Sequence, residues 1–284
     1  MSKHRILSRF FQQLANAVAP ALLVAASAAG PAQAGFITFE SVGANPGAIT
    51  PTRDDFRTAV GGGTLAGVNG SFGGTRREIN WDGVGAAASD PNPFPGNTFL
   101  IRGAVFSTPG TGFLVSANAG GAVPPVFGFP NDFQAFSLQK LFTAVNSNIT
   151  DVNFFVPGTN TLATTSAFAV IFTDVETAGS TSLQFFDKND QLIYSHDALT
   201  SGNLGLTFLG AVADAGERIS RVRIISGANT IVSNGVLGGG SVPDAVVMDD
   251  FLYAEPTALL PVPATLALAG CGLLLLGGFS RRAG

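Results

Sequence analysis

The stretch from Gly35 to Ala258 contains no helical periodicity that lasts for three turns. It is rich in Gly, Thr, Ser, Asn, Val and Phe, a composition typical of strands joined by frequent turns. About a dozen short apolar or alternating runs are separated by turn residues and not by helices. The stretch therefore predicts an all-β fold, a two-sheet β-sandwich like a jelly roll.

The predicted strands are Phe36–Glu40, Arg76–Trp81, Thr98–Arg102, Gly112–Ala117, Gln134–Leu138, Ile149–Val156, Ser166–Val175, Leu183–Asp187, Gln191–Ser195, Leu206–Val212, Ile219–Ile225 and Ala245–Tyr253. Ser166–Val175 is almost wholly apolar, which indicates a central strand with both faces buried. Lys188-Asn189-Asp190 separates two of the strands and predicts a hairpin turn. Between Gly43 and Gly74 we expect turns, with a small helical turn at Asp54–Arg57.

The amino-terminal residues predict a secretory signal peptide over Met1–Ala34. Lys3, Arg5 and Arg9 form a basic region, and an apolar stretch follows them. Ala32-Gln33-Ala34 is a cleavage site of the A-x-A type. We therefore expect Sec-type export and a mature protein that begins at Gly35. A first transmembrane helix is the competing interpretation of this segment.

The carboxyl-terminal residues Leu259–Gly284 form a second non-domain segment. No charge interrupts them from Leu259 to Phe279, and Arg281 and Arg282 follow. A run of about 18 or more apolar residues can cross a bilayer, with the following Arg residues on the cytoplasmic side. The sequence thus predicts three parts: a signal peptide at 1–34, an extracellular β-sandwich domain at 35–258, and a transmembrane segment at 259–284.

The same segment resembles the PEP-CTERM sorting signal of secreted proteins from Gram-negative bacteria. The matching features are Pro261-Val262-Pro263, the apolar run that follows, and Arg281-Arg282, in that order. Val262 stands where the signal has a central Glu. The resemblance implies an exosortase-type membrane protease as partner and a destination at the cell envelope, the cell surface or an extracellular matrix. A permanent single-span membrane anchor is the alternative.

Charge and cysteine content exclude several kinds of site. The predicted domain carries 19 Asp and Glu residues against 10 Lys and Arg residues, a net charge of −9. Nucleic-acid binding requires a basic surface, so we expect no nucleic-acid partner. The single cysteine, Cys271, lies in the carboxyl-terminal apolar run, so the domain has no disulfide and no Cys-based zinc site.

Three acidic residues at the two ends of the domain predict a calcium site. Glu40 lies on the first predicted strand, and Asp249 and Asp250 lie on the last. In a jelly roll the first and last strands commonly lie side by side, which would bring these carboxylates together around a hard cation. Their other interpretation is as solvent-facing residues or strand-end caps.

The single tryptophan lies among polar residues and predicts a sugar-binding surface. Trp81 has Arg76, Asn80 and Asp82 nearby in sequence. An indole ring can pack on a pyranose face while such polar groups fix the hydroxyls. A core position, with the indole N–H hydrogen-bonded, is the alternative for a lone Trp in a sandwich.

No G-x-S-x-G, H-E-x-x-H, P-loop or Rossmann motif occurs in the chain. We therefore expect a non-enzymatic surface or matrix protein that binds exopolysaccharide or another envelope component. Two alternatives remain. One is an extracellular glycan-active hydrolase or lyase with paired Asp and Glu residues. The other is a structural matrix protein without a small ligand.

Overall fold

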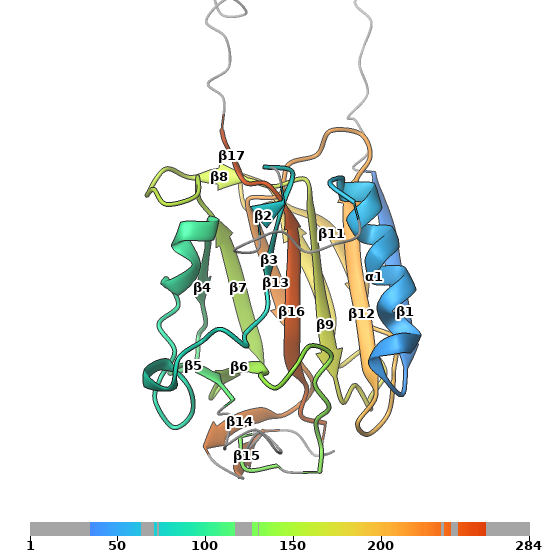
Figure 1. Ribbon diagram of the computed structural model, residues 1–284, viewed down its shortest axis with the longest axis vertical. Coiled ribbons are helices and arrows are strands. Elements are labelled where there is room, and N and C mark those ends of the chain that lie inside the picture. The colour runs from blue at the N-terminus through green and yellow to red at the C-terminus, as the bar shows by residue number, and fades with distance from the viewer. Residues whose placement is uncertain are drawn as a thin grey trace, which may run out of the picture. The chain divides into compact units, whose positions relative to one another are not determined.

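The computed structural model of the protein describes residues 35–63, 71–72, 74–116, 127–129, 131–233, 236–239 and 244–259. Strands dominate these residues and form two sheets that share one hydrophobic core, with a single α-helix on the outside of the larger sheet (Figure 1). The chain is thus an all-β sandwich, and this part of the prediction is confirmed.

The larger sheet has ten strands, with the neighbour order β1–β12–β9–β16–β6–β14–β15. In that order the strands are Phe36–Gly43, Leu206–Ala213, Ala167–Thr173, Val247–Ala254, Phe142–Val145, Thr230–Ser233 and Val236–Gly238. Three more strands join from the side: β2 (Ser71–Phe72) pairs with β3 (Arg76–Ile79), β3 pairs with β16, and β5 (Gly112–Val115) pairs with β6.

The smaller sheet has five strands in the order β11–β10–β13–β7–β4. These strands are Leu192–Asp197, Ser182–Phe186, Arg221–Ile225, Ile149–Phe154 and Ala104–Ser107. A separate two-stranded ribbon of β8 (Ala163–Thr164) and β17 (Thr257–Ala258) lies at one end of the sandwich, at the top of Figure 1.

Strand β9 is buried on both faces, as its apolar sequence predicts. Phe168, Val170 and Phe172 belong to the main core between the two sheets. Ala167, Ala169 and Ile171 alternate with them and face a second cluster that includes residues of α1. Burying each of the large side chains stabilises the fold by about 1.5–3 kcal/mol. The prediction of a central strand is confirmed.

The helix α1 (Pro46–Val60) corrects the expectation of turns with at most a small helical turn. Pro46 occupies the first turn, where its fixed φ suits a helix and its missing N–H costs nothing. Ile49 and Phe56 lie two turns apart on one face and are fully buried against the large sheet. Tertiary packing thus stabilises a helix whose sequence pattern is weak.

Two predicted strands are wrong. Thr98–Arg102 forms the 3₁₀-helix η3, which ends at Gly103 in a left-handed conformation with φ of 80°. Gln134–Leu138 is irregular because its N–H groups bind side chains instead of a neighbouring strand. The N–H groups of Phe136 and Ser137 donate to Asp249 Oδ2 over 2.6 and 3.2 Å.

A second 3₁₀-helix, η2, spans Ala86–Ala88.

The predicted hairpin is confirmed. Strands β10 and β11 are antiparallel, with Gln184 opposite Ser195. The Asp187 carboxylate closes the turn, because its Oδ1 accepts hydrogen bonds from the N–H groups of Asn189 and Gln191 over 2.8 and 2.9 Å. Such a side-chain turn is what an Asp at this position favours.

The predicted terminal segments fall outside the described part of the chain. This applies to the signal peptide at 1–34 and, apart from Leu259, to the sorting segment with Pro261, Val262, Pro263, Arg281 and Arg282. Among the described residues, no helix has both the length and the apolar character needed to cross a membrane.

Candidate functional site

Trp81 is a core residue, which corrects its predicted role as a sugar-stacking surface. Its relative exposure is 0%, and its ring stacks on Phe142 with centroids 4.0 Å apart and planes 3° apart. Its Nε1 donates a hydrogen bond to the Asp249 carbonyl oxygen over 2.8 Å. Since both faces of the indole are covered, the ring has no surface to offer a pyranose.

The polar residues near Trp81 in sequence do not form one surface. Asn80 is exposed, whereas Arg76 is fully buried. Asp82 is partly exposed, and its Oδ1 accepts the N–H of Lys140 over 3.1 Å. The predicted sugar site built from Arg76, Asn80, Trp81 and Asp82 is therefore wrong, because these side chains serve separate environments.

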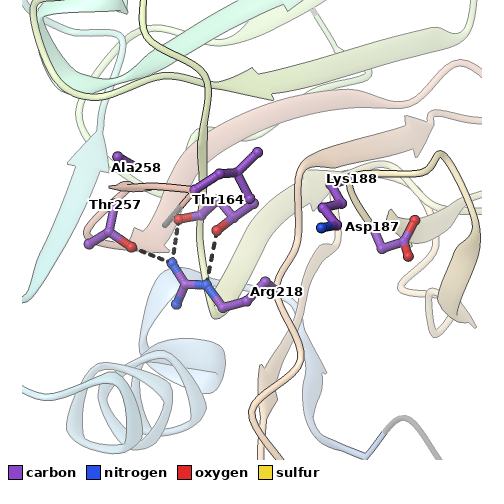
Figure 2. A pocket seen from close by; sticks show the side chains of 7 residues that line it. Thr164, Asp187, Lys188, Arg218, Thr257 and Ala258 are labelled. Carbon is purple, nitrogen blue, oxygen red and sulfur yellow. Dashed lines mark hydrogen bonds between the residues drawn. The ribbon is translucent and has the colours of Figure 1, made fainter. Parts of the chain in front are cut away.

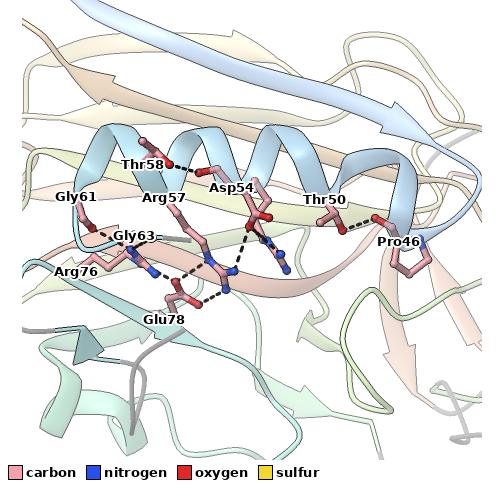
Figure 3. A network of polar contacts seen from close by, with 10 residues as sticks. Pro46, Thr50, Asp54, Arg57, Thr58, Gly61, Gly63, Arg76 and Glu78 are labelled. Atoms are coloured by element: carbon pink, nitrogen blue, oxygen red, sulfur yellow. Dashed lines mark hydrogen bonds and ion pairs between the residues drawn. The ribbon is translucent and has the colours of Figure 1, made fainter. Parts of the chain in front are cut away.

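Arg76 belongs to a buried ionic network between β3 and α1 (Figure 3). The Glu78 carboxylate accepts hydrogen bonds from Arg76 Nε over 2.7 Å and from Arg57 Nη2 over 2.6 Å. Arg76 Nη1 also donates to the carbonyl oxygens of Gly61 and Gly63 over 2.9 and 2.6 Å. The network joins the helix to the sheet and satisfies two buried guanidinium groups, so its role is structural.

The topology separates Glu40 from Asp249 and Asp250, which corrects the predicted shared calcium site. β1 pairs with β12, and β12 and β9 lie between β1 and β16. Three inter-strand steps of about 4.8 Å place these strands about 14 Å apart, whereas Ca²⁺–oxygen distances are about 2.3–2.6 Å. Glu40 Oε2 instead lies 2.9 Å from His196 Nε2 on β11.

Asp249 and Asp250 lie side by side in β16, where the pairing with β9 shifts register between Met248 and Phe251. Asp249 is 0% and Asp250 8% exposed. The Ser137 hydroxyl oxygen lies 2.9 Å from an oxygen of each carboxyl group. Burial raises the pKa of Asp249 well above its usual range, and it raises the pKa of Asp250 to about 6.

These buried acids hold the segment around Ser137 against β16 through hydrogen bonds from the N–H groups of Phe136 and Ser137 and from the Ser137 hydroxyl. Burial first, and then the neighbouring Asp250 carboxylate, raise the pKa of Asp249 and so favour its protonated form. Within the described residues, no three His, Cys, Asp or Glu side chains are grouped so that they could hold a metal ion.

A pocket of about 730 Å³ lies at the end of the sandwich where β8 and β17 pair (Figure 2). Four chain segments contribute to its wall. The lining residues are Thr164 in β8, Asp187 and Lys188 in the β10–β11 turn, Arg218 before β13, and Thr257, Ala258 and Leu259 at the β17 end. Its volume lies within the range of about 300–1,000 Å³ that is typical of small-molecule sites.

Arg218 is held in this wall by three hydrogen bonds to two threonines. Its Nε donates to Thr164 Oγ1 over 2.9 Å, and its Nη2 donates to the Thr164 carbonyl oxygen and to Thr257 Oγ1, each over 2.6 Å. Figure 2 shows the guanidinium group clamped between these two threonines. Burial lowers the pKa of Arg218, because desolvation disfavours its charged form.

The pocket combines hydrogen-bonding groups with an apolar contribution. Two threonine hydroxyls, a guanidinium and an ammonium group accompany the methyl of Ala258 and the side chain of Leu259. A few convergent polar groups beside apolar surface are the usual means by which a protein fixes a small polar ligand. Chemically, this wall can bind and orient a hydroxyl-rich molecule.

No motif in the sequence points to this pocket. Its lining residues come from positions 164, 187–188, 218 and 257–259, and only the fold brings them together. Asp187 and Lys188 are visible in the sequence as a turn, but a turn signal says nothing of a pocket beneath it.

Comparison with known proteins gives no family. No family model matches the chain, and no curated protein sequence matches it. Among solved structures, the chain has a likeness to the lectin-binding domain of Lectinolysin in complex with Lewis b, at 10% identity and a TM-score of 0.25, over 54% of this chain and 94% of that one. A second solved structure with a likeness to the chain is the enzymatically active domain of tailspike protein 4 from bacteriophage CBA120. The identity is 12% and the TM-score 0.26, over 62% of this chain and 21% of that one. At such scores neither likeness identifies a function.

Proposed function

We propose that the chain is an exported, surface- or matrix-associated, non-enzymatic protein that binds polysaccharide in the pocket between β8, β17 and the β10–β11 turn. The observation that carries this proposal is the composition of the pocket wall. Hydroxyl, guanidinium and ammonium groups converge there beside apolar surface, in a volume suited to sugar units.

The sequence at the two ends supports the destination. A predicted signal peptide precedes Gly35, and the PEP-CTERM-like segment follows Ala258. The first and last strands of the described chain, Phe36–Gly43 and Thr257–Ala258, lie between these two segments in the sequence. An exosortase-type protease would then recognise Pro261-Val262-Pro263 and remove the tail, which would release the sandwich to the surface or to an exopolysaccharide matrix.

The pocket chemistry favours binding over catalysis. Glycoside hydrolysis generally uses two carboxyl groups that flank the scissile bond. Asp187 supplies the one carboxylate among the described lining residues, and its Oδ1 is engaged by two backbone N–H groups of the turn. Asp249 and Asp250 do form a carboxyl pair, but they are buried beneath the segment around Ser137, where a polymer would not reach them.

We further propose that the sandwich is a jelly roll. Strands β6, β7, β9, β10, β11, β12, β13 and β16 serve as its eight strands in chain order. The large sheet then has the order first–eighth–third–sixth, and the small sheet the order second–seventh–fourth–fifth. This alternation between sheets supports a double Greek key.

A polysaccharide array probed with the purified full chain tests the binding function. We expect binding to a subset of the polysaccharides, with no new reducing ends when a bound polymer is incubated with the protein. Absence of binding to every polymer would overturn the proposed function. Release of new reducing ends would overturn its non-enzymatic part.

A further inference from the structure

The guanidinium group of Arg218 is held in place by hydrogen bonds from two of its three nitrogens, Nε and Nη2. Its Nε and Nη2 make three hydrogen bonds to Thr164 and Thr257. Within the described part of the chain, Nη1 makes no hydrogen bond that would use its two N–H groups. The group is thus fixed by the protein in the wall of the pocket and still has two N–H donors to offer, an arrangement suited to a ligand acceptor.

No carboxylate of the described residues lies within ion-pair distance of Arg218. This differs from Arg57 and Arg76, which both pair with Glu78. A partly buried cation without a counter-charge is unfavourable, as the lowered pKa of Arg218 indicates. An anionic group from a ligand would supply the missing partner, and a charge-assisted hydrogen bond is stronger than a neutral one.

Lys188 adds a second positive charge to the same wall. Its side chain is exposed and makes no ion pair with any described residue. The neighbouring Asp187 does not neutralise the wall fully, since its carboxylate is engaged by Asn189 and Gln191 in the hairpin turn. Two cations thus face one acid that is already hydrogen-bonded.

We propose that the ligand of this pocket is an anionic saccharide, whose acidic group is bound by Arg218 Nη1 and attracted by Lys188. The ligand class is a sugar unit of an acidic polysaccharide that carries a carboxylate or a sulfate group. This inference rests on the proposed function and narrows it from polysaccharides in general to acidic ones.

The net charge of the domain, −9, opposes this ligand at long range. At about 0.15 M ionic strength the Debye length is about 8 Å, so exposed charges farther away are largely screened. The partly buried Arg218 is screened much less and acts on a group in direct contact. Local charge in the pocket therefore decides the preference at physiological salt.

Binding of three polymers to the full chain at physiological salt tests the inference. The polymers are a polyuronate, a sulfated dextran and unmodified dextran. We expect at least one charged polymer to bind more tightly than dextran, and Arg218→Gln to weaken that binding about 10- to 100-fold. Lys188→Gln, at an exposed site, should weaken it by about 2- to 5-fold.

Arg53→Gln is the matched control, because it removes one positive charge from α1, which contributes no residue to the pocket. It should leave affinity unchanged, and melting temperatures of all variants check their folding. If Arg218→Gln does not fold, the affinity for the charged polymer is compared between Lys188→Gln and Arg53→Gln. A loss in Lys188→Gln alone then supports the inference. Equal binding of dextran and the charged polymers would overturn the inference and leave the proposed function standing. Unchanged affinity in both pocket variants would also overturn it. Absence of binding to any polysaccharide would instead remove the proposed function itself.

Discussion

The indole Nε1 of Trp81 donates a hydrogen bond to the backbone carbonyl oxygen of Asp249 over 2.8 Å. This bond joins the end of β3 to the point where β16 shifts register against β9. The sequence predicts Trp81 in a sugar-binding surface and Asp249 in a calcium site. In the structure the two residues instead contact each other in the interior. The tryptophan fills the core, and the carbonyl oxygen satisfies its buried N–H, as a buried Trp requires.

The first prediction follows from this burial. Trp81→Ala removes a ring that contacts Phe94, Phe106, Phe142 and Phe251. We expect a loss of about 3–5 kcal/mol in the free energy of unfolding, measured by urea denaturation. Leu138→Ala, at a side chain that is 80% exposed, should stay within about 0.5 kcal/mol of the wild type. Equal stability of Trp81→Ala and the wild type would show that the ring is not in the core.

The second prediction concerns the carboxyl pair of Asp249 and Asp250. Burial raises the pKa of both, so the folded protein holds protons that the unfolded chain releases. The contribution of Asp250 to stability is therefore full below its unfolded pKa of about 3.9, and it is lost as pH rises to about 6. The difference across this window is on the order of 3 kcal/mol.

Asp250→Asn tests this pH dependence, because an amide keeps the shape and cannot titrate. Urea denaturation at a series of pH values between these limits should show the variant gaining stability relative to the wild type as pH rises. Asp190→Asn, at a carboxylate in the exposed hairpin turn, serves as a comparison. A constant difference between Asp250→Asn and wild type at all pH values would contradict the buried-pair assignment.

A third prediction compares two glutamates that each pair with arginine. Glu78 is 7% exposed and partners Arg57 and Arg76, whereas Glu255 pairs with Arg77 at a partly exposed position. Glu78→Gln leaves two buried guanidinium groups undercompensated and should cost about 3–5 kcal/mol. Glu255→Gln should cost about 1 kcal/mol or less. Thermal melts would measure both, and equal losses would contradict a structural role for the buried network.

The fourth prediction concerns the sorting segment. If the Pro261-Val262-Pro263 segment is processed, mass spectrometry of protein released from the cell surface should find a mature carboxyl terminus upstream of Arg281. Replacing Arg281 and Arg282 by Gln should reduce this release. Surface-released protein that ends at Gly284 would instead indicate that the tail is retained.

Part of the fold could be predicted because its signals are local. The apolar run Ser166–Val175 predicts the central strand β9, and the turn around Lys188 predicts the hairpin of β10 and β11. In both cases residues close in sequence specify the structure, and contacts with residues far away in sequence are not needed for the prediction. The sequence does not predict helix α1, because Gly47 and Pro51 weaken its pattern and because Ile49 and Phe56 stabilise it only through contacts with the sheet.

The candidate site could not be predicted, for a topological reason. The expected pairing of the first and last strands fails because β12 and β9 lie between β1 and β16. The topology also brings distant residues together. Arg218 contacts Thr164 and Thr257 in the pocket wall, and both are far from it in sequence. Hydrogen bonds across 39 and 54 positions leave no spacing signal that a motif could carry.

The most direct test of the central claim is to fill the pocket and measure polysaccharide binding. Ala258 is an exposed lining residue of β17, so Ala258→Trp adds bulk to the pocket without entering the core. Ala215→Trp, at an exposed loop residue that does not line the pocket, is the matched control. The account predicts that Ala258→Trp loses affinity for the polysaccharide that the wild type binds, with an unchanged melting temperature, while Ala215→Trp keeps that affinity. Wild-type affinity in a folded Ala258→Trp variant would contradict the account.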